Sequence, residues 1–172
     1  MDNFDPITYI HRYACWTAAR AVQNPTTQVY STQVVTQALT NRDFINYLRD
    51  LQNLKSYEKI HSKLVNILMD EVDVPLDKKS FGVGAKILAI YFKTALIVPG
   101  LASGKEFPEL LKVIYPPIDS NVLLELGLKK IKWTKMTQDE HLLVIEAMLV
   151  KNGDEIINKG FWIMDYEFND NK

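Results

Sequence analysis

Two short stretches contain residues whose types and spacing could do covalent chemistry. The first, SFGVGAKILAIYFK, covers residues 80–93 and places Lys86 just after two glycines. A lysine in the first turn of a helix feels the positive end of the helix dipole, which lowers the pKa of its amine and favours the neutral, nucleophilic form. The second, PPIDSNV, covers residues 116–122 and presents Asp119 at the mouth of a helix after a rigid Pro-Pro corner. An amine and a carboxylate 33 residues apart are therefore the predicted reactive pair.

The two glycines have two interpretations. Glycine weakens a helix by ~1 kcal/mol relative to alanine, so its presence twice at a helix start requires a structural reason. In the first interpretation, Gly82, Val83 and Gly84 form a turn between two helices, and the exposed backbone N–H groups bind a DNA phosphate. In the second, Ser80 is a helix N-cap and the glycines lie in the first turn, where they let the helix pack tightly against the alanine-rich residues 14–22.

Asp119 also has a structural interpretation. An aspartate after two prolines is a good helix N-cap, because its carboxylate accepts hydrogen bonds from the first free amides. A capping carboxylate stays ionised, so this role is compatible with a catalytic one.

The elements that must position these residues are helices, because the hydrophobic period is helical almost everywhere and strand signals are scarce. The length of 172 residues favours one sizeable core, and we expect a single all-α domain over residues 1–172 with eight or so helices. In the first helix the predicted buried stripe includes Tyr13, and alanines leave room for a second helix to pack closely. The predicted helices cover residues 7–22, 31–40, 42–54 (capped by Asn41), 57–72 (capped by Ser56), 85–98, 107–114, a segment starting at Asp119 or Ser120, and 138–149 (capped by Thr137).

Composition excludes several classes of protein. No run approaches the ~20 apolar residues of a membrane span, the first residues do not resemble a signal peptide, and we expect a cytoplasmic protein with no membrane partner. The single cysteine, Cys15, excludes an internal disulfide and a clustered-thiolate metal site, and is expected to be a small buried hydrophobe. His11, His61 and His141 are predicted on separate helices without metal-ligand spacing, as packing or surface residues. No metal and no cofactor are expected.

Charge is uneven along a chain whose net charge is only −1. Residues 78–135 carry 10 basic and 4 acidic side chains, whereas residues 136–172 carry 3 and 8. A local basic face can contact phosphates even on a neutral protein. Lys129, Lys130 and Lys132 are the predicted DNA-binding lysines of this block, although solvated helix faces would show the same excess.

The segments GVGAKILAI and PIDSNVLLELGLKK resemble the helix-hairpin-helix DNA glycosylases, the superfamily of endonuclease III and the 8-oxoguanine DNA glycosylases. The hairpin of that family runs Gly-Val-Gly-x-Lys, and its catalytic aspartate opens a helix in a Val-Asp-Thr-His-Val-like segment. The resemblance covers about 55 residues, 80–135, and the wide separation of lysine and aspartate is similar to that of the archaeal 8-oxoguanine branch. Phe81 stands where the family prefers proline, and the lone cysteine excludes the iron-sulfur cluster of some members.

The resemblance implies a role for each residue that matches the motif. Gly82, Val83 and Gly84 fall at the hairpin, Lys86 at the nucleophile and Asp119 at the catalytic aspartate. Lys86 would attack the anomeric carbon and form a Schiff base, while Asp119 would stabilise the oxocarbenium-like sugar as the base departs. The implied function is repair of damaged or modified DNA, with the base and the oligomeric state left open.

A glycosylase also needs a pocket for an extruded base, which aromatic side chains usually wall. Trp16 lies in an apolar helix, which favours a place in the core. The alternative function is a non-catalytic helical domain that uses its lysines to bind DNA or a protein. The candidates for the pocket wall are Trp16, Tyr91, Tyr115, Trp133, Phe161 and Trp162.

Overall fold

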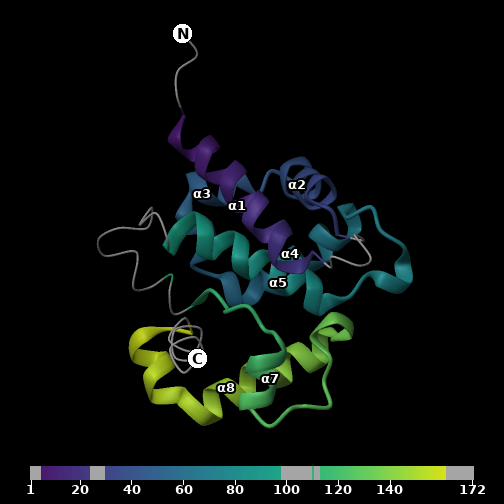
Figure 1. Ribbon diagram of the computed structural model, residues 1–172. Coiled ribbons are helices and arrows are strands. Elements are labelled where there is room, and N and C mark those ends of the chain that lie inside the picture. The colour runs from purple at the N-terminus through teal and green to yellow at the C-terminus, as the bar shows by residue number, and fades with distance from the viewer. Residues whose placement is uncertain (1–4, 24–29, 98–109, 111–112, 162–172) are drawn as a thin grey trace.

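The computed structural model describes residues 5–23, 30–97, 110 and 113–161 (Figure 1). These residues contain helices and no β-strand, which confirms the predicted all-α class. The predicted helix over residues 107–114 lies largely outside them. The α-helices are α1 (Pro6–Val22), α2 (Thr32–Asn41), α3 (Ile45–Arg49), α4 (Tyr57–Glu71), α5 (Phe81–Phe92), α7 (Ser120–Glu125) and α8 (Gln138–Lys159).

Short polar side chains fix most of the helix starts. Asp5 begins α1 by accepting a hydrogen bond from the amide of Ile7, and Thr137 begins α8 as part of a capping box with Glu140. Ser56 precedes α4, but its side chain makes no capping hydrogen bond.

The predicted helix over residues 42–54 is wrong in its extent. Asn41 ends α2 instead of capping a new helix, and Asp43 then adopts a positive φ of 51°. The chain resumes as the single turn and a half of α3 and breaks again at Asp50, whose extended backbone leads into a 3₁₀ turn over Leu51–Leu54. Asn and Asp, which favour turns, therefore shorten this helix at both ends.

Helix α5 is the centre of the fold. It packs between α1 and α4, and most of its residues are buried, from Gly82 to Phe92. Apart from His11, the buried stripe on α1 consists of small residues, among them Ala14, Cys15 and Ala18, so the two helix backbones approach closely. Tyr13, which the predicted stripe included, is exposed instead.

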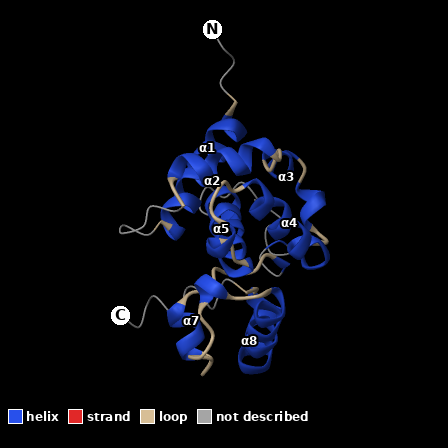
Figure 2. Ribbon diagram, turned by 90° about the vertical axis from the view of Figure 1, so that its right-hand side faces the viewer, coloured by secondary structure: helices blue, strands red, loops and turns tan. Residues whose placement is uncertain are grey.

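The helices form two groups: α1 to α5 make up the first, and α7 and α8 form the second beside it. In Figures 1 and 2 α7 and α8 lie together below α1 to α5, and α5 contacts α8. Between α7 and α8 a 3₁₀ turn over Trp133–Lys135 returns the chain to α5. One cluster of buried side chains includes residues from both groups, so the two groups share a core.

A buried pair of histidines joins the two groups. His61 of α4 and His141 of α8 stack with ring centroids 4.9 Å apart and planes 21° from parallel, and both are 2% exposed. Their burial agrees with the predicted packing role, but they are not isolated from one another. Burial, with His141 beside it, lowers the pKa of His61 to about 3. Burial likewise lowers the pKa of His141 to about 4, and both rings are neutral at pH 7.

This pair predicts a loss of stability in mild acid. In the unfolded chain each imidazole takes up a proton below about pH 6.5, whereas the folded chain resists protonation until about pH 4. The two neutral histidines therefore destabilise the folded state only below about pH 6.5. As the pH drops from there toward 4, the free energy of unfolding falls by up to about 1.4 kcal/mol per pH unit for each histidine. Urea unfolding at pH 7, 6 and 5 measures this slope.

The matched variant is His141→Phe, which keeps an aromatic ring in the stack. The Nδ1 atom of His141 is buried without a hydrogen-bond partner, so phenylalanine removes a titrating group and breaks no bond there. We expect this variant to lose less stability between pH 7 and pH 5 than the parent protein. Equal slopes would show that the histidine pair does not control the acid response.

A candidate lysine and aspartate site

The first turn of α5 is a capped helix start and contains no hairpin. Ser80 accepts a hydrogen bond from the amide of Val83 (3.2 Å), and its carbonyl accepts one from the amide of Gly84 (3.3 Å). The amide of Gly82 donates to the carbonyl of Met136 (3.0 Å). All three of the residues predicted to bind a phosphate through their backbone are therefore buried and already bonded within the protein, which corrects that prediction for Gly82, Val83 and Gly84.

The glycines are required by close packing on two sides of α5. A Cβ atom on Gly82 would lie 2.2 Å from the carbonyl oxygen of Trp133 and 2.8 Å from Cβ of Met136. A Cβ atom on Gly84 would lie 2.7 Å from Cγ of Met69 and 2.9 Å from Cγ1 of Val65, both on α4. The predicted capping role of Ser80 is confirmed, but the glycines face α4 and residues 133–136, and not residues 14–22 of α1.

The contact at Gly82 places an aromatic ring against Lys86. Residues four apart lie on the same helix face, so Lys86 follows Gly82 toward the same neighbouring segment. Its Nζ atom lies 4.3 Å from the centroid of the Trp133 ring, within the range of a cation–π interaction. The side chain is half-buried between its own helix and this ring.

Asp119 is positioned by the start of α7. Its Oδ1 atom accepts hydrogen bonds from the amides of Asn121 (2.9 Å) and Val122 (3.2 Å), which confirms the predicted N-cap role. Burial lowers the pKa of Lys86 below its ordinary value, and the carboxylate of Asp119 acts in the opposite direction. The fold has therefore brought the predicted amine and carboxylate, from different helices, into electrostatic interaction.

A pocket of about 460 Å³ lies next to this pair, and its lining residues include a sequence neighbour of Asp119 and a contact of Lys86 but not the two residues themselves. It begins at Ser120, the residue after Asp119, and Trp133 forms part of its wall. Among the described residues, no acidic side chain lines it. The lining residues are Ser120, Asn121, Leu123, Leu124, Lys129, Ile131, Lys132, Trp133 and Thr134.

The lysines reach this pocket because α7 ends at a glycine. Gly127 has a positive φ of 74°, and the amides of Gly127 and Leu128 bond back to the carbonyls of Leu124 and Leu123. This left-handed turn stops the helix and redirects the chain into the segment that carries the lysines. Lys129, Lys130 and Lys132 are all exposed, and the first and last of them line the pocket.

The other aromatic residues predicted for a pocket wall have different environments. Tyr91, Tyr115 and Phe161 are buried in the core, and the hydroxyl of Tyr91 bonds to His11 (2.7 Å). Trp16 is 49% exposed on α1, so its predicted place in the core is wrong. Trp162 lies outside the described residues. Of the predicted set, Trp133 is the residue that contacts Lys86.

No family model, curated protein or solved structure matches the chain. Within the described residues, no cluster of His, Cys, Asp and Glu side chains could hold a metal ion. None of the helices in that part of the chain is long and apolar enough to cross a bilayer.

The packing around α5 predicts unequal effects of two alanine substitutions. Gly82→Ala would force a Cβ atom into the backbone of Trp133, which cannot yield without moving the 133–136 segment. We expect a loss of about 1–3 kcal/mol or more in unfolding free energy. Gly84→Ala meets side-chain atoms of Met69 and Val65 and no backbone among its nearest neighbours, and it gains helix propensity, so we expect a smaller loss.

NMR distinguishes displacement of the segment from a general loss of stability. The ring current of Trp133 should shift the ε-methylene protons of Lys86 upfield, since the amine lies over the ring. We expect this shift to disappear in Gly82→Ala and to persist in Gly84→Ala. An unchanged shift in Gly82→Ala would show that Gly82 does not position Trp133.

Proposed function

We propose that this protein is a DNA glycosylase with lyase activity, in which Lys86 is the nucleophile and Asp119 the supporting carboxylate. The observation that carries the proposal is the electrostatic interaction of Lys86 of α5 with Asp119, the N-cap of α7, next to a pocket whose described lining residues include lysines and no acidic residue. The match of Lys86 and Asp119 to the lysine and aspartate of the family motif supports the same pairing, although the hairpin of that motif is absent here. The substrate class is damaged or modified DNA.

In the proposed reaction, the bond between the base and the C1′ carbon of its sugar breaks as the amine of Lys86 forms a bond to C1′. The departing base takes the bonding electrons and a proton. Positive charge develops on the sugar ring in the transition state, and the carboxylate of Asp119 stabilises it. The proton on the departing base comes from the attacking amine. The C1′–O4′ bond of the adduct then breaks, O4′ takes the remaining amine proton, and a Schiff base forms between Lys86 and C1′. Loss of a proton from C2′ with departure of the 3′ phosphate then cleaves the strand.

The surroundings of Lys86 suit an amine that must react. Burial favours the neutral form, which alone is nucleophilic, while the charge of Asp119 favours the charged form. The ring of Trp133 is the group in contact with the amine. A DNA strand that covers the pocket would remove more water from the amine and shift this balance toward the neutral form.

The lysine segment after α7 supplies the charge that the substrate needs. Lys129, Lys130 and Lys132 are exposed within a few residues of Trp133, so phosphates on either side of the reacting nucleotide could reach them. The apolar side chains of the same pocket, such as Ile131, suit a sugar or base.

Substitutions at the two reactive residues separate their roles. Asp119→Asn keeps an oxygen that can cap α7, so the unfolding free energy should change by well under ~1 kcal/mol. Base excision should fall by about 100-fold or more, because a preorganised charge is lost from the site.

Lys86→Gln should keep the fold and DNA binding but abolish covalent trapping by borohydride on DNA with an abasic site. Excision kinetics, trapping and melting temperature are measured on both variants.

Lys135→Gln is the matched control, since Lys135 is exposed and lies two residues from Trp133. It should trap like the parent protein. Trapping that survives Lys86→Gln would exclude Lys86 as the nucleophile. An Asp119→Asn variant that excises at the parent rate would leave that residue with its capping role alone. No trapping by the parent protein on any damaged DNA would favour a non-catalytic helical interaction domain.

Charge reversal tests the DNA face. Changing Lys129, Lys130 and Lys132 together to Glu should weaken DNA binding and flatten its salt dependence by about three units of slope, about one for each lost phosphate contact. The matched control reverses Lys55, Lys59 and Lys63, which are equally exposed and carry the same total charge. If the two triple variants weaken binding equally, the DNA does not bind at Lys129, Lys130 and Lys132, and these lysines act only through the net charge of the protein.

A further inference from the structure

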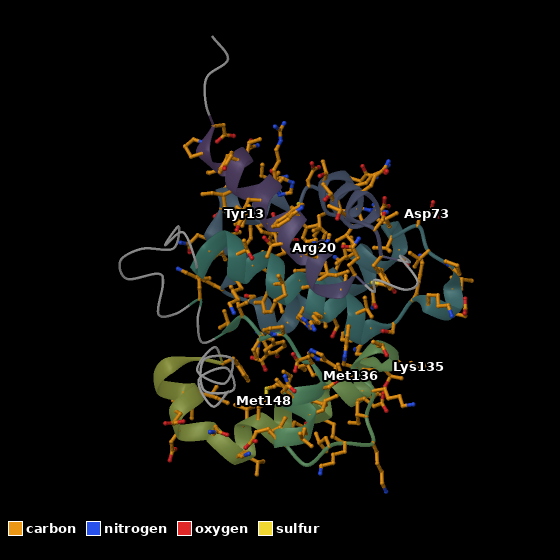
Figure 3. The ribbon with its side chains drawn as sticks, in the orientation of Figure 1. Tyr13, Arg20, Asp73, Lys135, Met136 and Met148 are labelled. Carbon is orange, nitrogen blue, oxygen red and sulfur yellow. The ribbon has the colours of Figure 1, made fainter. Side chains whose placement is uncertain are left out.

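The exposed face of α1 has an unusual composition. Tyr9, Tyr13 and Trp16 are 64%, 52% and 49% exposed, although large aromatic side chains usually lie inside. Arg12 and Arg20 are exposed on the same helix. The spacing of three and four residues puts all five side chains on one face, where Figure 3 labels Tyr13 and Arg20. We call these five residues the α1 aromatic face.

The large side chains of this face present flat π systems. The rings of Tyr13 and Trp16 stack on one another, with centroids 6.0 Å apart and planes 23° from parallel. None of the five side chains is aliphatic. By contrast, the large apolar side chains that α8 exposes are all aliphatic, namely Leu142, Leu143, Leu149, Val150 and Ile157. A helix-binding groove on a protein partner would suit the surface of α8 better than that of α1.

The charge of the α1 aromatic face is positive and uncompensated. Helix α1 contains no acidic residue. Among the residues that the structure describes, Arg12 forms no ion pair, and the guanidinium of Arg20 bonds to the neutral side chain of Gln23. The neighbouring helix α2 carries no charged side chain at all. Asp5, the N-cap of α1, lies at the N-terminal end of this face, and its carboxylate pairs with Arg49 (3.2 Å). An anionic partner would therefore meet two exposed arginines and one acidic residue that is already paired.

We propose that the α1 aromatic face binds single-stranded DNA, with bases stacked on Tyr13 and Trp16 and phosphates held by Arg12 and Arg20. Aromatic platforms flanked by cations are the general means by which proteins bind single strands without sequence preference, because every base has a π face. A duplex keeps those faces inside its own stack. The opposite side of α1 packs on α5, so this surface is separate from Lys86 and its pocket.

The test uses a fluorescein-labelled 15-nucleotide dT strand and fluorescence anisotropy. Every protein in this test also carries Lys129→Glu, Lys130→Glu and Lys132→Glu, so that the proposed DNA face near Lys86 does not contribute to binding. Trp16→Ala should weaken binding by about 5-fold to 100-fold, the range expected for loss of stacking on one base. Trp16→Phe should restore it to within about threefold, because a phenyl ring also stacks. The double reversal of Arg12 and Arg20 to Glu should abolish binding.

The controls distinguish single-stranded DNA from a protein partner and from duplex DNA. Leu142→Ala and Leu149→Ala, on the exposed face of α8, should leave the affinity for dT unchanged. A 15-base-pair duplex should bind at least tenfold more weakly than the single strand. Equal binding in Trp16→Ala and its background, or equal competition by polyglutamate, would overturn the proposal; the second result would indicate an acidic protein partner instead.

Discussion

The contact between Gly82 and the backbone of residues 133–136 is the interaction on which the candidate site depends. It combines a hydrogen bond from the Gly82 amide to the carbonyl of Met136 with an approach so close that no Cβ atom fits. Through it the segment that follows α7 is fixed against the start of α5, and Figure 3 places Met136 where the two groups of helices meet. Since Lys86 follows one turn after Gly82, the same contact sets the ring of Trp133 against the lysine amine. Helix packing and the geometry of the reactive group therefore have a single cause.

Lys86 is the one charged residue of a helix that is otherwise apolar and mostly buried. An ammonium group in such a place is costly unless other groups compensate it. The compensation comes from the far half of the chain, as the carboxylate of Asp119 and the ring of Trp133. Asp119 can act in this way because its own position is fixed by the two amides at the start of α7. Asp119 and Trp133 thus offset the cost of burying the Lys86 ammonium group. The lysine lies next to a pocket lined by Lys129 and Lys132.

Local signals in the sequence were sufficient for the features that depend on neighbouring residues. The capping roles of Ser80 and Asp119 follow from side chains that bond amides two and three positions away, and both are confirmed. The partner of each glycine was not predictable, because Gly82 meets a backbone from a distant part of the chain and Gly84 meets α4. Trp16 was misplaced for a similar reason. The contact with α5 requires small residues, and alanines fill it, so the large aromatic side chains of α1 turn outward.

The most direct test of the central claim is to locate the covalent bond itself. The protein would be incubated with DNA containing an abasic site, reduced with borohydride, digested, and mapped by mass spectrometry for the peptide that carries the sugar remnant. We expect one modified residue, Lys86, because its side chain is half-buried, its amine lies over the ring of Trp133, and the charge of Asp119 acts on it. Modification of the exposed Lys129, Lys130 or Lys132 in its place, or modification scattered among surface lysines, would contradict it.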